Sequence, residues 1–206
     1  MIEGPKFVWM HLPKTGGTSM NRLIRDLQIP QVIVDEDQYD HKHDSISLRE
    51  KQSGWKAGTR QRFITARRLS AWLISDWQHK RRHMGVPDLD FEPVRSGLFY
   101  SFRLGGTWVA ADWWLQYFEV NADVQALRLE HLSEDLNDYL LPLLPEGTPK
   151  FMFLPRENAK PDHLNEGEPC FTTEDLKRIF LINPKWSEWE QQVYGNILNT
   201  SSSPEH

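Results

Sequence analysis

The chain has 206 residues, carries a formal net charge of −5, and is 39% hydrophobic and 26% charged. This mixture excludes a disordered chain and predicts one globular domain over residues 1–200, with a disordered tail at 201–206. Its one cysteine, Cys170, excludes an intramolecular disulfide and a cysteine-based zinc site. Because no apolar stretch has the length of a signal-peptide core or a membrane span, we expect a cytoplasmic protein with no membrane partner.

The hydrophobic pattern alternates between strands and helices along the chain. In chain order it predicts a strand at 6–12, a helix at 18–27, a strand at 31–35, a helix at 45–52, a strand at 62–66, helices at 70–82 and 107–118, a strand at 123–129, and helices beginning at 133, at 172 or 173, and at 184. Residues 40–44, 87–103 and 155–168 are expected to be irregular. The alternation indicates the α/β class, with a central parallel sheet flanked by helices on both faces.

Ligands of such sheets bind beyond the carboxyl ends of the strands. The predicted loops at 13–19, 41–45 and 67–70 all follow strands, so we expect them to meet at one edge. Positive charge is concentrated between Lys56 and His83, where eight Lys and Arg residues accompany a single Asp. In an acidic protein this favours an anionic ligand, and we expect no nucleic-acid partner. A solvated helix face explains the charges of Lys80–Arg82 equally well.

The segment HLPKTGGTS at 11–19 lies between a predicted strand and a predicted helix. Its two glycines let backbone N–H groups turn toward a ligand, and the helix N-terminus adds a partial positive charge. A lysine and three hydroxyl groups complete an anion-binding loop. The predicted donor-binding residues are Pro13, Lys14, Thr15, Gly16, Gly17, Thr18 and Ser19. A plain tight turn is the alternative, and it explains the glycines but not the lysine and the hydroxyls.

The order of residues in this loop differs from a Walker A motif, in which the lysine follows the glycines. It resembles the 5′-phosphosulfate loop of PAPS-dependent sulfotransferases, especially the carbohydrate branch related to heparan sulfate 2-O-sulfotransferase, which commonly shows H-[IL]-P-K-T-G-G-T-S. The resemblance implies a P-loop-type sheet and a transferase. It implies PAPS as donor substrate, PAP as product and no metal.

A second family element involves Arg67 and Ser75. The resemblance implies that an arginine ending a strand and a serine eight residues later bind the 3′-phosphate of the donor, and RFITAR ends at Arg67 with Ser75 at that distance. A planar guanidinium suits bidentate phosphate contacts. The family usually continues Arg-Asp-Pro or Arg-Asn-Pro, whereas Arg68 and Leu69 follow here, which puts the conformation of this turn in doubt.

The segment KHDS at 42–45 resembles a stretch in bacterial members of this branch. The resemblance implies that His43 takes the proton of the acceptor hydroxyl, a task for which imidazole has a suitable pKa. His41 is the alternative base, and a surface histidine is the alternative explanation. Residues 127–136 and 155–160 resemble later family segments more thinly, and maintenance of the fold explains Glu130 and Asp135 at least as well.

The implied reaction is in-line transfer of a sulfuryl group to a hydroxyl of an unidentified acceptor, a glycan or a small molecule. Lys14 and the loop amides would stabilise the charge that develops on the departing phosphate. Three alternatives remain: a P-loop nucleotide kinase, a non-catalytic protein that binds PAP or another nucleotide, and a nucleic-acid binder. Neither the acceptor nor the oligomeric state follows from the sequence.

Overall fold

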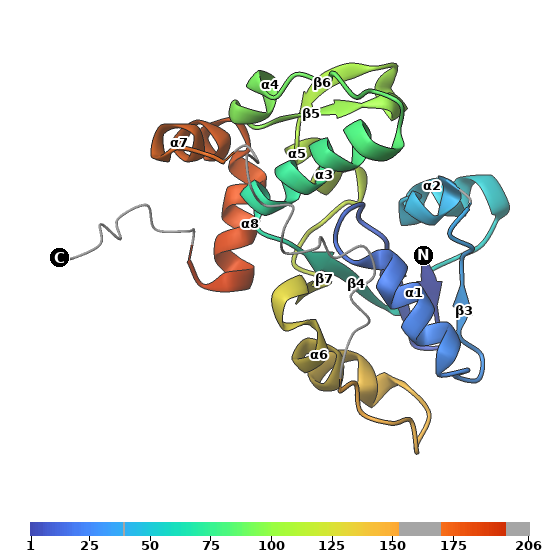
Figure 1. Cartoon of the computed structure of the whole chain (residues 1–206). Coiled ribbons are helices and arrows are strands. Elements are labelled where there is room, and N and C mark those ends of the chain that lie inside the picture. Colours follow the sequence, from blue (N-terminus) through green and yellow to red (C-terminus); the bar gives the residue numbers. More distant parts are fainter. Residues whose placement is uncertain (39, 153–169, 197–206) are drawn as a thin grey trace. The chain divides into compact units, whose positions relative to one another are not determined.

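The computed structural model describes residues 1–38, 40–152 and 170–196. Close backbone contacts divide the described residues into two compact units, residues 1–66 with 116–152 and residues 67–115 with 170–196. Their helices and strands are labelled in Figure 1. The single domain predicted for 1–200 stays a prediction. The predicted tail at 201–206 and the predicted loop at 155–168 lie outside the described residues. Within the described ranges, no helix combines the length and the apolar character that a membrane crossing requires.

The first unit contains a five-stranded sheet in the order β3-β1-β2-β4-β7. Its strands are β1 (Ile2–Glu3), β2 (Phe7–Met10), β3 (Ile33–Val34), β4 (Gln61–Ala66) and β7 (Val124–Arg128). Strands β2, β4 and β7 run parallel, while β1 is antiparallel to both β2 and β3. The α/β class is therefore confirmed, but the sheet is mixed. Residues 4–6 explain the difference, because so short a connection joins antiparallel strands only.

The helices of the first unit are α1 (Gly17–Asp26), η1 (Asp40–His43), α2 (Ile46–Ser53), η3 (Leu129–His131), α6 (Leu132–Asp135), η4 (Leu136–Leu140) and η5 (Leu141–Leu143). Helices α1, α2 and α6 begin close to the predicted positions, whereas residues 40–43, predicted to be irregular, form a short 3₁₀ helix. The core forms on one face of the sheet, where Trp9 is paired with Phe63 and both pack with Met20 and Ile24 of α1. Burial of this apolar face fixes where α1 starts relative to the end of β2.

The second unit differs from the prediction at two segments. Its elements are α3 (Leu69–His83), α4 (Glu92–Arg95), β5 (Leu98–Ser101), η2 (Phe102–Leu104), β6 (Thr107–Ala110), α7 (Thr173–Ile182), α8 (Pro184–Tyr194) and the first part of α5 (Asp112–Tyr117). The region at 87–103 is not irregular throughout, and the helix predicted at 107–118 is a strand followed by a shorter helix. Strands β5 and β6 pair antiparallel.

Gly105 and Gly106 are the physical reason for this hairpin. Both have positive φ, at 82° and 78°, a backbone conformation that glycine adopts without steric cost. The N–H of Gly106 donates to the carbonyl of Ser101 at 2.9 Å, which reverses the chain. The β-branched and aromatic residues that follow then form a strand rather than the first turn of a helix.

Candidate functional site

The loop after β2 has the backbone that an anion site needs. Lys14 and Gly16 have positive φ, 64° and 82°, so successive peptide groups change direction here. A Cβ at Gly16 would lie 2.8 Å from Cδ1 of Leu129, so space as well as φ requires glycine. Helix α1 then begins at Gly17. The predicted strand, glycine loop and helix therefore follow one another as the sequence indicated.

The N-terminus of α1 has neither a capping side chain at its N-cap position nor an acidic residue in its first turn. The N-cap residue is Gly16. The first N–H groups of an α-helix lack acceptors within the helix and carry the positive end of its dipole. Both features favour a bound anion at this end.

The predicted loop side chains differ in how they are placed. Lys14 and Ser19 are half-buried, and Thr18 is exposed. Thr15 is buried, and its hydroxyl donates to the carbonyl of Leu12 at 2.7 Å, so in this structure the hydroxyl holds the loop together. Roles for Pro13, Lys14, Thr15, Gly16, Gly17, Thr18 and Ser19 in donor binding stay predictions.

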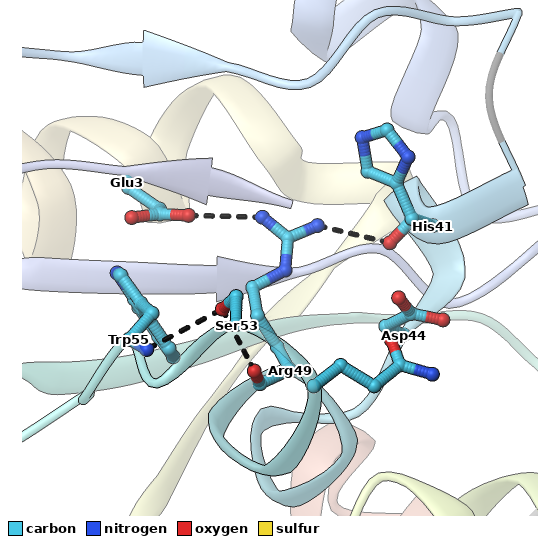
Figure 2. Close-up of a pocket in the computed structure, with 7 residues that line it drawn as sticks. Glu3, His41, Asp44, Arg49, Ser53 and Trp55 are labelled. Carbon is cyan, nitrogen blue, oxygen red and sulfur yellow. Dashed lines mark hydrogen bonds and ion pairs between the residues drawn. The ribbon is translucent and has the colours of Figure 1, made fainter.

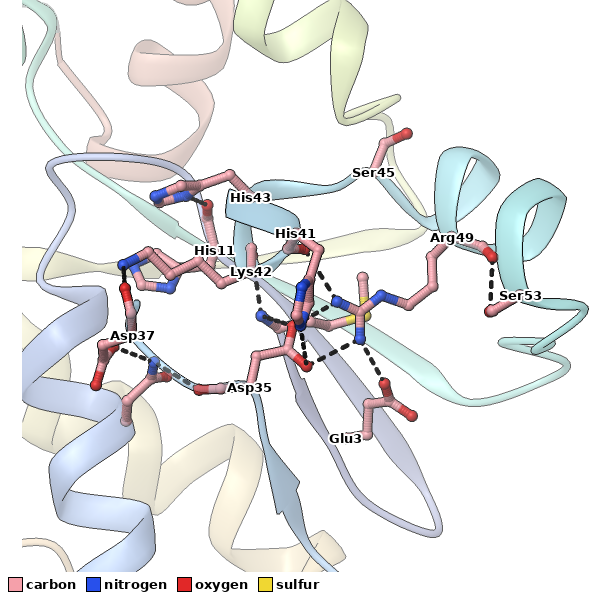
Figure 3. A network of polar contacts seen from close by, with 12 residues as sticks. Glu3, His11, Asp35, Asp37, His41, Lys42, His43, Ser45, Arg49 and Ser53 are labelled. Atoms are coloured by element: carbon pink, nitrogen blue, oxygen red, sulfur yellow. Dashed lines mark hydrogen bonds and ion pairs between the residues drawn. The ribbon is translucent and has the colours of Figure 1, made fainter. Parts of the chain in front are cut away.

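His43 is held at the start of this loop. Its Nδ1 lies 2.8 Å from the carbonyl oxygen of His11, the residue after β2 and Met10 (Figure 3). Because a carbonyl only accepts, Nδ1 of His43 carries the proton in this contact, and Nε2 of the neutral ring then carries a lone pair. This is the tautomer that a general base requires at Nε2.

The His41 side chain points in a different direction from that of His43, toward Asp35, as Figure 3 shows. Its Nε2 is 3.8 Å from Oδ1 of Asp35, and its side chain is 48% exposed. Asp35 also binds Arg49, which contacts Glu3 at 2.9 Å. His43 thus contacts the backbone of His11, whereas His41 contacts Asp35.

Asp37 connects α1 to the turn that carries His43. Its carboxylate accepts hydrogen bonds from Asn21 and Arg25 of α1, each at 2.7 Å, and its carbonyl accepts from Lys42. Although burial alone would raise the pKa of Asp37, the bonds from Arg25 and Asn21 lower it below the ordinary value. Asp37 thus contacts α1 through its carboxylate and the histidine turn through its backbone carbonyl.

Arg67 and Ser75 lie in the second unit, before and within α3. Ser75 is the seventh residue of this helix, about 9 Å along its axis from the first. Arg67 precedes the N-cap residue, Arg68, and both Arg67 and Ser75 are half-buried. The structure therefore confirms the strand, turn and helix around them, while their binding of a 3′-phosphate stays a prediction.

The N-terminus of α3 is occupied by a carboxylate of the chain itself. Glu190 of α8, 1% exposed, accepts the Leu69 N–H at 2.8 Å and contacts Arg68 at 3.1 Å. Arg68 also donates to Asn196 and lies 4.1 Å from the centre of the Tyr194 ring. Arg68 stands where the resemblance predicts an acidic or amide residue, and it contacts Glu190, Tyr194 and Asn196.

A cavity of about 330 Å³ lies beside α2 in the first unit (Figure 2). Its lining residues are Glu3, His41, Asp44, Arg49, Gln52, Ser53 and Trp55. Neither His43 nor any residue of 13–19 lines it, and Arg49 is already bound by two carboxylates. Of the two candidate bases, the cavity therefore contacts His41 and not His43.

Three side chains that sequence reasoning missed now stand out: His11, Asp37 and Glu190. His11 belongs to the loop motif, so its position was the one signal the sequence offered.

No group of His, Cys, Asp and Glu among the described residues is arranged to hold a metal ion. No protein family, no curated protein and no solved structure matches this chain.

Proposed function

We propose that the protein is a sulfotransferase that moves a sulfuryl group from PAPS to a hydroxyl, with a P-loop-type arrangement around β2 and α1. The observation that carries the proposal is the loop at 11–19. It combines a lysine, two glycines and three hydroxyls with a helix N-terminus that has glycine at its N-cap position and no acidic residue in its first turn. The resemblance of HLPKTGGTS to the phosphosulfate loop supplies the donor.

The reaction is a displacement at sulfur. The acceptor oxygen forms a new bond to sulfur, the bond between sulfur and the bridging phosphate oxygen breaks, and the electron pair stays on the departing 5′-phosphate of PAP. Lys14 and the N–H groups at the start of α1 stabilise that charge. Nε2 of His43 takes the proton of the acceptor hydroxyl, and the Nδ1–H bond to His11 stabilises the resulting cation.

Arg67 and Ser75 bind the 3′-phosphate in this proposal, so that interactions far from sulfur orient the reacting atoms. Arg67 supplies a planar pair of donors and Ser75 a hydroxyl on α3. The acceptor is a hydroxyl of a carbohydrate or a small molecule. Support for a carbohydrate comes from the branch that the loop resembles.

Titration calorimetry with PAP, AMP and ATP tests the donor half of the proposal. PAP should bind more tightly than AMP, which lacks the 3′-phosphate, and ATP should bind weakly with or without magnesium. Equal affinity for PAP and AMP would remove Arg67 and Ser75 from the site. Tight magnesium-dependent binding of ATP would instead favour a kinase.

Transfer from labelled PAPS to a panel of acceptors tests the catalytic half. His43→Ala should bind PAP normally and lose about 10²–10⁴-fold in transfer rate, the usual contribution of a positioned base. His41→Ala is the matched control and should retain activity. If His43→Ala and His41→Ala both match the unmodified protein, or if no acceptor is sulfated, the catalytic half is wrong and a non-catalytic PAP-binding protein remains.

A further inference from the structure

His11 touches both parts of the proposed site. Its backbone carbonyl accepts the Nδ1–H of His43 at 2.8 Å, and the two imidazole rings meet edge to face with their centres 4.7 Å apart. The His11 side chain is buried, with 7% exposed. The orientation of His43 therefore depends on the backbone and the ring of His11 together.

The His11 ring also lies directly against the start of α1. A Cβ added at Gly17 would lie 1.5 Å from Nε2 of His11, a distance at which the ring must move. Gly17 does not have positive φ, so its backbone would accept alanine, a good helix former. The glycine is therefore required here by the imidazole and not by the backbone.

The structure also keeps His11 neutral. Its Nδ1 is buried and has no hydrogen-bond partner among the described residues. Protonation would bury an N–H without an acceptor, which is costly. Burial, followed by the nearby His43, holds the pKa of His11 well below 6.5.

We propose that His11 is a neutral positioning residue that couples the anion loop to the base, holding His43 in the Nδ1–H tautomer while its ring supports Gly17 at the start of α1. This inference rests on the proposed function for its catalytic meaning. The contacts of His11 with His43 and with Gly17 do not depend on that function.

A double-mutant cycle between His11 and Gly17 tests the coupling. Gly17→Ala should weaken PAP binding about tenfold, because the methyl group displaces the ring. In the His11→Ala background the same change should alter the PAP affinity by less than about twofold, since the obstructing ring is gone. Additive effects of the two changes would overturn the inference. Melting temperatures of all four proteins identify any variant that does not fold.

Nitrogen NMR of the histidine rings supplies a readout that works without turnover or PAP. Neutral His43 should be protonated at Nδ1 in the unmodified protein, and should shift toward protonation at Nε2 in Gly17→Ala. An Nε2–H tautomer in the unmodified protein, or a tautomer unchanged by Gly17→Ala, would overturn the inference. Failure of the unmodified protein to bind PAP, with the tautomer as expected, would instead count against the proposed function alone.

Discussion

The residues of the proposed donor site lie at two junctions between a parallel strand and a helix. The two junctions differ in what lies at the N-terminus of the helix. At the first, β2 leads through Lys14 and Gly16 into α1, whose N-terminus has no side-chain cap and no acidic residue. At the second, β4 leads into α3, whose first N–H donates to the buried carboxylate of Glu190. Both helix ends favour negative charge. At the second, Glu190 of the same chain supplies that charge.

The difference shows that a helix N-terminus can serve either the stability of the fold or the binding of a ligand. Glu190 gains a helix N–H and an arginine, so the α3 junction is stabilised within the second unit. The α1 junction has a glycine at its N-cap position and no acidic residue in the first turn of the helix, which favours an anionic ligand there in the proposed function. In the proposed function, the α1 end therefore binds through the backbone and Lys14, whereas Arg67 and Ser75 must bind through their side chains.

Replacement of Lys14 should have the largest effect, on turnover. Lys14→Ala should lower the transfer rate by about 10²-fold or more, the loss expected when one pre-organised charge donor is removed. The melting temperature should change little, because Lys14 is only half-buried and belongs to a loop. Turnover from labelled PAPS and a thermal melt measure the two quantities.

Lys51→Ala is the control, since this lysine lies exposed in the last turn of α2. It should leave both turnover and melting temperature unchanged. Near-normal turnover of Lys14→Ala would show that the first junction binds an anion without contributing to catalysis. The contrast between the two junctions would then lose its functional meaning.

Glu190→Gln should have the next largest effect, on stability. The amide keeps an oxygen for the Leu69 N–H but removes the negative charge beside Arg68, so we expect the free energy of unfolding to fall by about 2 kcal/mol. Urea denaturation followed by tryptophan fluorescence measures it. Glu188→Gln, at an exposed position on the same helix, should cost less than about 0.5 kcal/mol. Equal midpoints for the two variants would contradict the assigned role of Glu190.

The sequence predicted the first junction well and the second only in outline. The glycines and the apolar spacing around 13–27 are local signals, so the strand, loop and helix followed directly from them. The partner of Leu69 lies 121 residues away in α8, and no local pattern reveals such a contact. Strand β1 has only two residues, too few for a hydrophobic period, and its pairing with β2 makes the sheet mixed.

The hairpin at 98–110 shows a different limit. Its second strand continues into an apolar, tryptophan-rich run that fits a buried helix as well as a strand, because periodicity does not separate the two over so few residues. The adjacent pair Gly105 and Gly106 was the usable signal for a turn. The link between the loop and His43 through the His11 ring depends on tertiary packing, which the motif alone does not contain.

The smallest expected effect concerns how the first junction responds to acid. Because folding lowers the pKa of His11, the unfolded chain binds a proton at this residue that the folded protein does not. Stability should therefore decline as the pH falls below 6.5, with a slope that approaches about 1.4 kcal/mol per pH unit from this residue. Burial opposes ionisation of Asp35 and Asp37, but their hydrogen bonds lower both pKa values from 3.8. These two carboxylates therefore add to the loss of stability only below about pH 3.8.

His11→Ala should remove this part of the slope between pH 6.5 and 5, although the lost ring lowers stability at every pH. The comparison must therefore be made between slopes of unfolding free energy and not between absolute values. His131→Ala, which changes a ring that is 48% exposed, is the control and should keep the slope of the unmodified protein. If His11→Ala has the same slope as the unmodified protein, His11 takes up its proton in the folded state as readily as in the unfolded chain. The first junction would then gain a second positive charge in acid, and its preference for an anion would strengthen as the pH falls.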